Sequence, residues 1–184
     1  RSVPDDELHK MLIEEIKRKH PANLTAYDRV MRGRWALSRW SEGLAKARDW
    51  FEGAIAADPE SGLAHACLAN TLSLGVLALG LSPDDALSRA REHAEGAIVL
   101  DPGNAQVNAY AATAYTFCGD SGRAVSHAER AVALGPNDAR SLNALGQALT
   151  YAGDQQRALE WFARSEKFDP YAPDDDRLDI ICDC

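Results

Sequence analysis

Apolar side chains recur along the chain with the spacing of amphipathic helices, and a proline closes each apolar run. Four alanine-rich runs end at the dipeptides Asp58-Pro59, Asp101-Pro102, Gly135-Pro136 and Asp169-Pro170. Because proline cannot continue a helix, each dipeptide marks the end of a helical unit. The last three prolines are evenly spaced, so the pattern predicts an all-α protein built from a repeated pair of helices.

Small side chains recur at fixed places within each unit. When the closing proline is numbered as repeat position 32, positions 20 and 27 are small, which lets two antiparallel helices approach closely. These residues are Ala47, Ala90, Ala124 and Ala158 at position 20, and Ala54, Ala97, Ala131 and Ser165 at position 27. Position 8 is Gly33, Ala69, Ala112 and Gly146, and position 24 is Phe51, Ala94, Ala128 and Phe162. The first unit fits this numbering with two extra residues in its turn.

In these positions residues 26–170 resemble the tetratricopeptide repeat (TPR) family, whose period of about 34 residues is also the spacing of the last three prolines. The resemblance implies helix–turn–helix repeats stacked as a right-handed superhelix, an α-solenoid. We divide the chain into an N-terminal amphipathic helix and linker (1–25), four repeats (26–60, 61–103, 104–137 and 138–171), and the start of a truncated fifth repeat or capping helix (172–184). Phe162 is expected to be buried between its own helices and the unit that follows.

The second repeat is nine residues longer than the period, and the excess lies between its two helices. Ser82 followed by Pro83 and two acids predicts a helix start there, so the first helix of this repeat is expected to run past its usual end. We expect its apolar extension (Val76, Leu77, Leu79 and Leu81) to pack on the N-terminal helix (Leu8, Leu12 and Ile16) or on another subunit.

Near the end of the sequence, the apolar residues Leu178, Ile180 and Ile181 predict a docked helix over 174–182.

The stretch "GDSGRAVSH" at 119–127 has the spelling of a serine-protease nucleophile, with His127 six residues after Ser121. The repeat gives a simpler interpretation, because Gly119-Asp120 falls in the interhelical turn where Gly153-Asp154 falls in the next repeat. An antiparallel helix pair supplies neither a base nor an oxyanion hole to a serine in that turn. Ser121 is therefore predicted to be a turn residue, and no catalytic residues are expected.

The chain is also expected to hold no metal or cofactor. His93 and His127 share repeat position 23, which would place them about 8–10 Å apart, too far to share a metal. Cys182 and Cys184 supply half a zinc site at best, and the other cysteines, Cys67 and Cys118, stand on different helices.

The inner face of a TPR superhelix is lined by first-helix positions 2, 5, 6, 9, 12 and 13. In the third and fourth repeats these positions mix aromatic and hydrogen-bonding side chains, as peptide-binding faces do. The predicted groove residues are Tyr110, Thr113, Phe117, Arg140, Asn143, Gln147 and Tyr151. We expect the three rings to stay partly exposed and Arg140 to contact an anion. A carboxylate clamp of the TPR type would need Lys and Asn at positions 5 and 9, where the second repeat has Ala66 and Asn70.

The net charge of −8 argues against a nucleic-acid surface, and the apolar run Leu72–Leu81 is too short to span a bilayer. Four cysteines in 184 residues form no disulfide framework, which fits a cytoplasmic protein. Because the chain begins at Arg1 and not at methionine, we expect it to be part of a longer protein.

The sequence thus predicts a non-catalytic protein-interaction or scaffolding module that binds a peptide or protein segment in its concave groove. The partner would be another protein or another domain of the same chain, and a weak homodimer is also expected. The alternative function comes from "NLTAYDRVMRGRW" and "FDPYAPDD", which resemble TPR regions that follow class III adenylate cyclase or winged-helix domains in bacterial proteins. By that resemblance the chain would be the regulatory part of such a protein.

Overall fold

The structure is a computed structural model that describes residues 24–38 and 40–168. These residues form eight α-helices and no strand. The helices are α2 (Ala26–Leu37), α3 (Trp40–Ala57), α4 (Gly62–Ala78), α5 (Pro83–Leu100), α6 (Ala105–Phe117), α7 (Ser121–Leu134), α8 (Ala139–Tyr151) and α9 (Gln155–Phe168).

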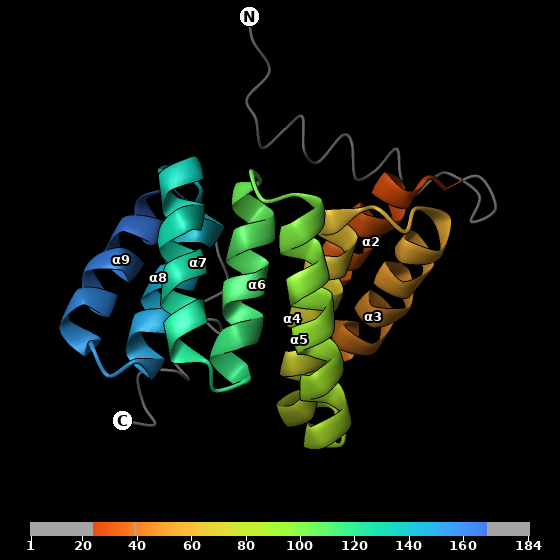
Figure 1. The fold of residues 1–184 in the computed structure, drawn as a ribbon, viewed down its shortest axis with the longest axis horizontal. Helices are drawn as coiled ribbons and strands as arrows, with labels where there is room; N and C mark the ends of the chain where they lie inside the picture. Colours follow the sequence, from red (N-terminus) through yellow and green to blue (C-terminus); the bar gives the residue numbers. More distant parts are fainter. Residues whose placement is uncertain (1–23, 39, 169–184) are drawn as a thin grey trace, which may run out of the picture.

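The helices form four hairpins that follow one another in a row (Figure 1). Within the row, α2, α4, α6 and α8 pack on one another in order and make an inner layer. The second helices make an outer layer, in which α3, α5 and α7 each also contact the first helix of the next hairpin. This arrangement is an α-solenoid and confirms the fold predicted from the repeat.

Polar side chains fix where most of the helices begin. Thr25 and Asp28 form a capping box at α2, in which Asp28 N donates to Thr25 Oγ1 (3.1 Å) and Thr25 N donates to Asp28 Oδ2 (3.0 Å). Asn104, Asp120 and Asp138 accept backbone N–H groups at the starts of α6, α7 and α8. Such caps satisfy amides that have no partner within the helix, so they hold each helix start in register with the repeat.

The second hairpin is longer than its neighbours and projects beyond them, at the bottom of Figure 1. Helix α4 has 17 residues, against 13 in α6 and in α8, as expected from the insertion. Ser82 occupies the N-cap position of α5, but its side chain makes no capping hydrogen bond. Leu77 at the tip is 75% exposed, whereas Leu81 folds back over Gly75. The expected contact with the N-terminal helix lies outside the described residues.

Close packing between the two helices of a hairpin takes one of two forms. In the first hairpin Gly33 lies directly against the ring of Phe51, and a Cβ on Gly146 in the fourth would lie 2.7 Å from Phe162 Cε1. The middle hairpins instead place alanine at both positions, and these four alanines are completely buried. A large ring at position 24 therefore goes with glycine at position 8, because no Cβ fits beneath it.

Phe51 is fully buried, but Phe162 is only partly buried, so its expected burial is not complete. Helix α9 is the last described helix, and any unit that would cover Phe162 from the other side lies outside the described residues. The position-24 ring is thus fully buried in the first hairpin and only partly buried in the last described hairpin.

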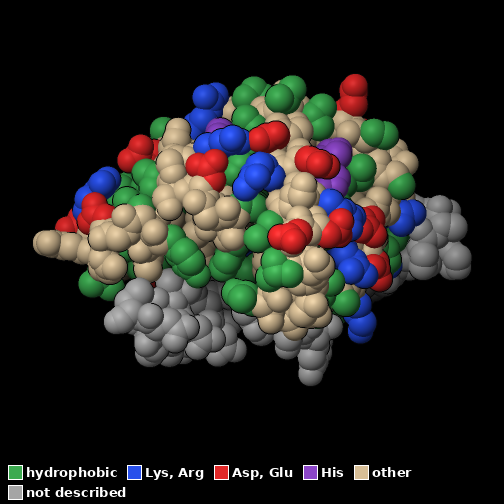
Figure 2. Space-filling view, turned by 60° about the horizontal axis from the view of Figure 1, so that its bottom comes forward, with side chains coloured by type: hydrophobic (Ala, Val, Ile, Leu, Met, Phe, Trp, Pro, Cys, Tyr) green, Lys and Arg blue, Asp and Glu red, His purple; other side chains and the backbone are tan. Residues whose placement is uncertain are grey.

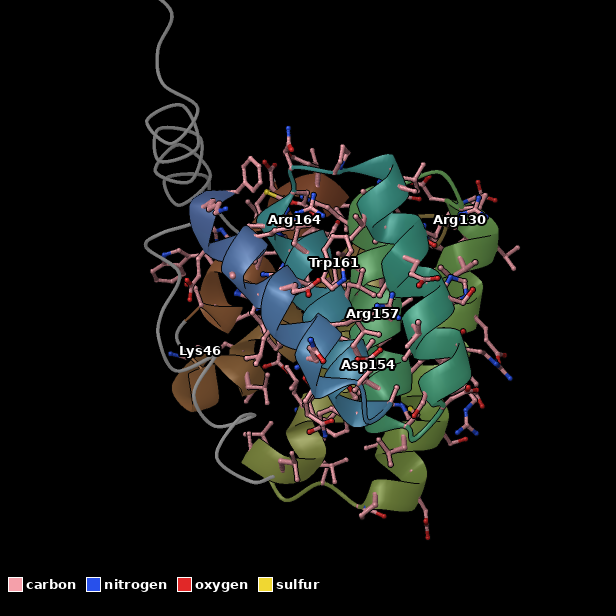
Figure 3. The ribbon with its side chains drawn as sticks, turned by 90° about the vertical axis from the view of Figure 1, so that its left-hand side faces the viewer. Lys46, Arg130, Asp154, Arg157, Trp161 and Arg164 are labelled. Atoms are coloured by element: carbon pink, nitrogen blue, oxygen red, sulfur yellow. The ribbon has the colours of Figure 1, made fainter. Side chains whose placement is uncertain are left out.

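Ion pairs connect successive outer helices at matching repeat positions. Arginine at position 19 meets glutamate at position 25 of the preceding repeat, and this contact occurs three times. The pairs are Arg89–Glu52 (3.4 Å), Arg123–Glu95 (2.5 Å) and Arg157–Glu129 (3.7 Å). Figure 3 shows Arg157 on α9 between Asp154 and Trp161, and Figure 2 shows basic and acidic side chains interspersed over one face. Exposed pairs of this kind contribute little to stability, because water screens the two charges.

We predict that Gly33→Ala lowers the free energy of unfolding by about 1–3 kcal/mol, because the new Cβ collides with the buried Phe51 ring. Phe51→Ala alone should cost about 3–5 kcal/mol. The double variant recreates the Ala–Ala pair of the middle hairpins, so its cost should be smaller than the sum of the two single costs. Urea titration of the four proteins measures this coupling, and strictly additive costs would show that the two positions do not share space.

Candidate functional site

The residues predicted to bind a partner lie on α6 and α8, in the inner layer of the solenoid. Tyr151 is 49% exposed and Arg140 is also exposed. Thr113, Phe117 and Asn143 are half-buried, and Gln147 is 8% exposed.

Tyr110 is only 1% exposed, so the prediction that its ring stays partly exposed is wrong. The guanidinium of Arg140 lies over the ring, 4.5 Å from its centroid, and covers it from the α8 side. Tyr110 thus belongs to the buried surface beneath the inner face, while Phe117 and Tyr151 have the exposure that was predicted.

Phe117 and Tyr151 form one end of the inner face, here called the aromatic pair. Their rings meet edge to face with centroids 5.7 Å apart. Both residues occupy repeat position 13, so the repeat period places them side by side on adjacent inner helices. A partly exposed aromatic pair offers a large apolar contact area at a small cost in conformational entropy.

A polar cluster forms the other end, here called the arginine–tyrosine cluster. Its members come from four inner helices: Arg34 (α2), Cys67 (α4), Gln106 and Tyr110 (α6), and Arg140 (α8). Arg34 Nη1 donates to Gln106 Oε1 at 3.1 Å, a contact that reaches across the whole second repeat. Two guanidinium groups therefore approach Tyr110, one from each side along the row of inner helices.

The cluster contains many donors and few acceptors. Tyr110 Oη is buried without a hydrogen-bonding partner, although the Arg34 side chain and the Cys67 thiol lie close enough to influence its ionisation. Burial raises the pKa of Tyr110, and the nearby Arg140 and Arg34 charges oppose that rise. Burial raises the pKa of Cys67 to about 12, so this thiol stays protonated near neutral pH. A protonated thiol is neither a nucleophile nor a metal ligand.

Sequence reasoning overlooked Arg34 and Cys67 as members of this site. The repeat numbering places them at positions 9 and 6, which are both inner positions. The numbering could therefore have identified both residues as part of the inner face. The predicted groove residues came from the third and fourth repeats alone. The contact between Arg34 and Gln106 skips a repeat, and no pattern within one repeat predicts such a contact.

Ser121 lies at the start of α7, directly after Asp120, the N-cap residue. Gly119 and Gly153 have φ angles of 75° and 87°, the left-handed conformation that glycine adopts most easily. The Nδ1 atom of His127 lies 3.2 Å from Asn108 Oδ1, and the ring stacks on Tyr115. The imidazole is thus engaged by α6. Ser121 is the first residue of α7, so the turn in which it was predicted ends one residue earlier, at Asp120.

His93 is paired with His65, a contact that the sequence analysis missed. Their Nδ1 atoms are 2.9 Å apart, and His65 Nε2 lies 3.0 Å from the carbonyl oxygen of Pro59. The carbonyl fixes a proton on His65 Nε2, so the Nδ1–H of neutral His93 donates to His65 Nδ1. The next repeat places Asn108 and His127 at the same two positions, 4 and 23. Within the described ranges, no three His, Cys, Asp or Glu side chains come together as a metal site.

The pKa of His93 is lowered by burial first and then by His65 and Arg89, against the opposing charges of Glu92 and Glu52. The folded protein therefore keeps His93 neutral at pH values where the unfolded chain, with its ordinary pKa of 6.5, takes up a proton. We predict that the free energy of unfolding falls as the pH is lowered from about 8 to about 5.

His65→Asn recreates the Asn–His pair of the third repeat and should make this fall smaller, because a neutral amide replaces the second imidazole. Urea titrations of both proteins across the pH range measure the difference. An identical pH dependence would show that the pair is not linked to folding.

No helix in the described part of the chain is long and apolar enough to cross a membrane. No family model matches the sequence, and no curated protein matches it. The crystal structure of MamA is 17% identical with a TM-score of 0.50, and the match covers 90% of this chain and 88% of that chain. The MamA AMB-1 structure is 15% identical with a TM-score of 0.50, covering 89% and 90% of the two chains.

A third structure is YrrB, described as "a TPR protein with an unusual peptide-binding site". It is 20% identical with a TM-score of 0.47, and the match covers 95% of this chain and 88% of that chain. MamA is likewise a TPR protein. The MamA likeness and the four stacked hairpins together show that the chain has the fold of a TPR-type α-solenoid.

Proposed function

We propose that the chain binds a peptide or an extended protein segment along the inner face of the solenoid and has no catalytic activity of its own. One observation carries this proposal: a partly exposed aromatic pair and a donor-rich cluster lie on the same row of inner helices. Buried aromatic and arginine anchors supply most of the energy in protein interfaces, and here both kinds stand on one face.

The spacing of the two ends suits an extended peptide. Arg140 and Tyr151 are eleven residues apart on α8, which corresponds to about 17 Å at 1.5 Å per residue. About five residues of extended chain cover this distance. Asn143 and Thr113 lie between the ends and are half-buried, so their polar atoms can meet the backbone of a peptide laid along this face.

The wider setting of this function rests on sequence alone. The resemblance of two short stretches to regions beside cyclase or winged-helix domains stays a prediction, as do the cytoplasmic location and the weak homodimer. Each is compatible with a peptide-binding face, which could recognise another protein or another part of a longer chain.

The proposal is tested by selecting peptides from a random library on the full chain and then measuring their affinity for variants. Tyr151→Ala should weaken binding about 5- to 30-fold, or about 1–2 kcal/mol, because it removes half of the aromatic pair. Phe168→Ala is the matched control, since Phe168 is 48% exposed but lies on the outer helix α9. Equal affinities for Tyr151→Ala and the unmodified chain would contradict binding on the inner face.

A further inference from the structure

Charge is divided unevenly between the two layers of helices. Helices α4, α6 and α8 contain no aspartate or glutamate, and the one acid of α2 is Asp28, which belongs to the capping box. The same inner helices carry four arginines: Arg29, Arg32, Arg34 and Arg140. The inner layer is therefore positively charged, although the chain as a whole has a net charge of −8. Such a surface suits a partner segment that is negatively charged.

Arg34 faces a neutral amide, whereas arginines of the outer helices face carboxylates. Arg89, Arg123 and Arg157 each contact a glutamate of the preceding repeat. Arg34 Nη1 instead donates to Gln106 Oε1, and no carboxylate of the described residues pairs with its guanidinium. The group is half-buried and carries five N–H donors, so most of them stay available to a ligand.

Two further side chains add donors beside this guanidinium. Gln106 and Tyr110 are four residues apart on α6 and so lie on the same face of that helix. The bond to Arg34 uses Gln106 Oε1 and leaves the two N–H groups of Nε2. Tyr110 Oη is buried without a hydrogen-bonding partner, which is costly. What this part of the inner face lacks is an acceptor.

A carboxylate supplies both what Arg34 lacks in charge and what the three side chains lack in acceptors. The aromatic pair fixes how far away the rest of the partner must reach. Gln106 and Phe117 are eleven residues apart on α6, which corresponds to about 17 Å at 1.5 Å per residue. About five residues of extended chain cover this distance, so one short segment can contact both ends.

We propose that Arg34, Gln106 and Tyr110 bind the carboxylate of an aspartate or glutamate side chain in the partner. An apolar residue about five positions away in the same segment then contacts the aromatic pair. This inference rests on the proposed function, since it names the chemistry of the segment that the inner face binds. Arg140 lies over the Tyr110 ring and is not one of the carboxylate's ligands.

The test selects peptides from a random library on the full chain. The selected peptides are then synthesised with acetylated and amidated ends, so that side chains alone carry charge. We expect aspartate or glutamate to be enriched about five positions from an aromatic or aliphatic residue. Replacing that acid by asparagine or glutamine should weaken binding about tenfold, as measured by fluorescence anisotropy of the labelled peptide.

Changes to the site itself should remove the preference for the acid. Arg34→Gln should weaken binding of the acidic peptide about tenfold and hardly affect its amide counterpart, because both changes remove the same contact. Arg34→Lys should restore part of the affinity, since it keeps the charge and loses the planar fork. Tyr110→Phe should weaken binding about threefold, whereas a merely structural tyrosine would leave affinity unchanged.

Arg91→Gln is the matched control, because it removes an exposed arginine from the outer helix α5 and should leave the affinity for the acidic peptide as it was. Far-ultraviolet circular dichroism confirms that each variant is folded. Should Arg34→Gln fail to fold, the acidic peptide and its amide counterpart still test the inference on the unmodified chain.

Selected peptides without an enriched acid, or equal affinities for the acidic peptide and its amide counterpart, would overturn the inference. If losing the acid costs as much on Arg34→Gln as on the unmodified chain, the acid is recognised elsewhere and the assignment to Arg34 is wrong. Peptides that lose affinity on Tyr151→Ala but ignore the acid would leave the proposed function standing while this inference falls. Selection of no peptide at all would overturn the proposed function, and this inference with it.

Discussion

The close approach of the two helices in each hairpin is the constraint on which the rest of the structure depends. Small residues at positions 8, 20 and 27 let backbones approach where longer side chains would hold them apart. The residue at position 24 fills the space that remains beside position 8. It is a phenylalanine ring over glycine in the first and fourth hairpins, and alanine against alanine in the two middle hairpins. The interior is mostly alanine, so its geometry leaves little room for larger groups.

That geometry recurs in every repeat, and the recurrence is what builds the candidate site. Residues at one repeat position form a row across successive inner helices, as Phe117 and Tyr151 do at position 13. On the outer helices, arginine and glutamate also recur at fixed repeat positions, and they form the three Arg–Glu contacts. In a solenoid most contacts join neighbouring repeats, so a contact that skips a repeat depends on the hairpin between its two members. The bond from Arg34 to Gln106 therefore reports on the packing of the whole second hairpin.

Much of the fold follows from sequence because proline and small residues recur in phase, and their physical roles are local. The length of α4, the glycine turn at Gly119 and the helix start at Pro83 could all be predicted, because each depends on residues close together in the sequence. The errors concern contacts between elements. Exposure of Tyr110 depends on where Arg140 of the next helix folds, and the His65–His93 pair joins two helices of one hairpin. Such contacts depend on side-chain directions that a periodic pattern does not specify.

The central claim is that the inner face is where this chain meets its partner. The most direct measurement is a two-dimensional amide NMR titration of the full chain with a library-selected peptide, mapped onto the helices. The account predicts that the perturbed amides cluster on α4, α6 and α8 and along the turn of α2 that carries Arg34. Perturbations confined to the exposed faces of α5, α7 and α9 would contradict it.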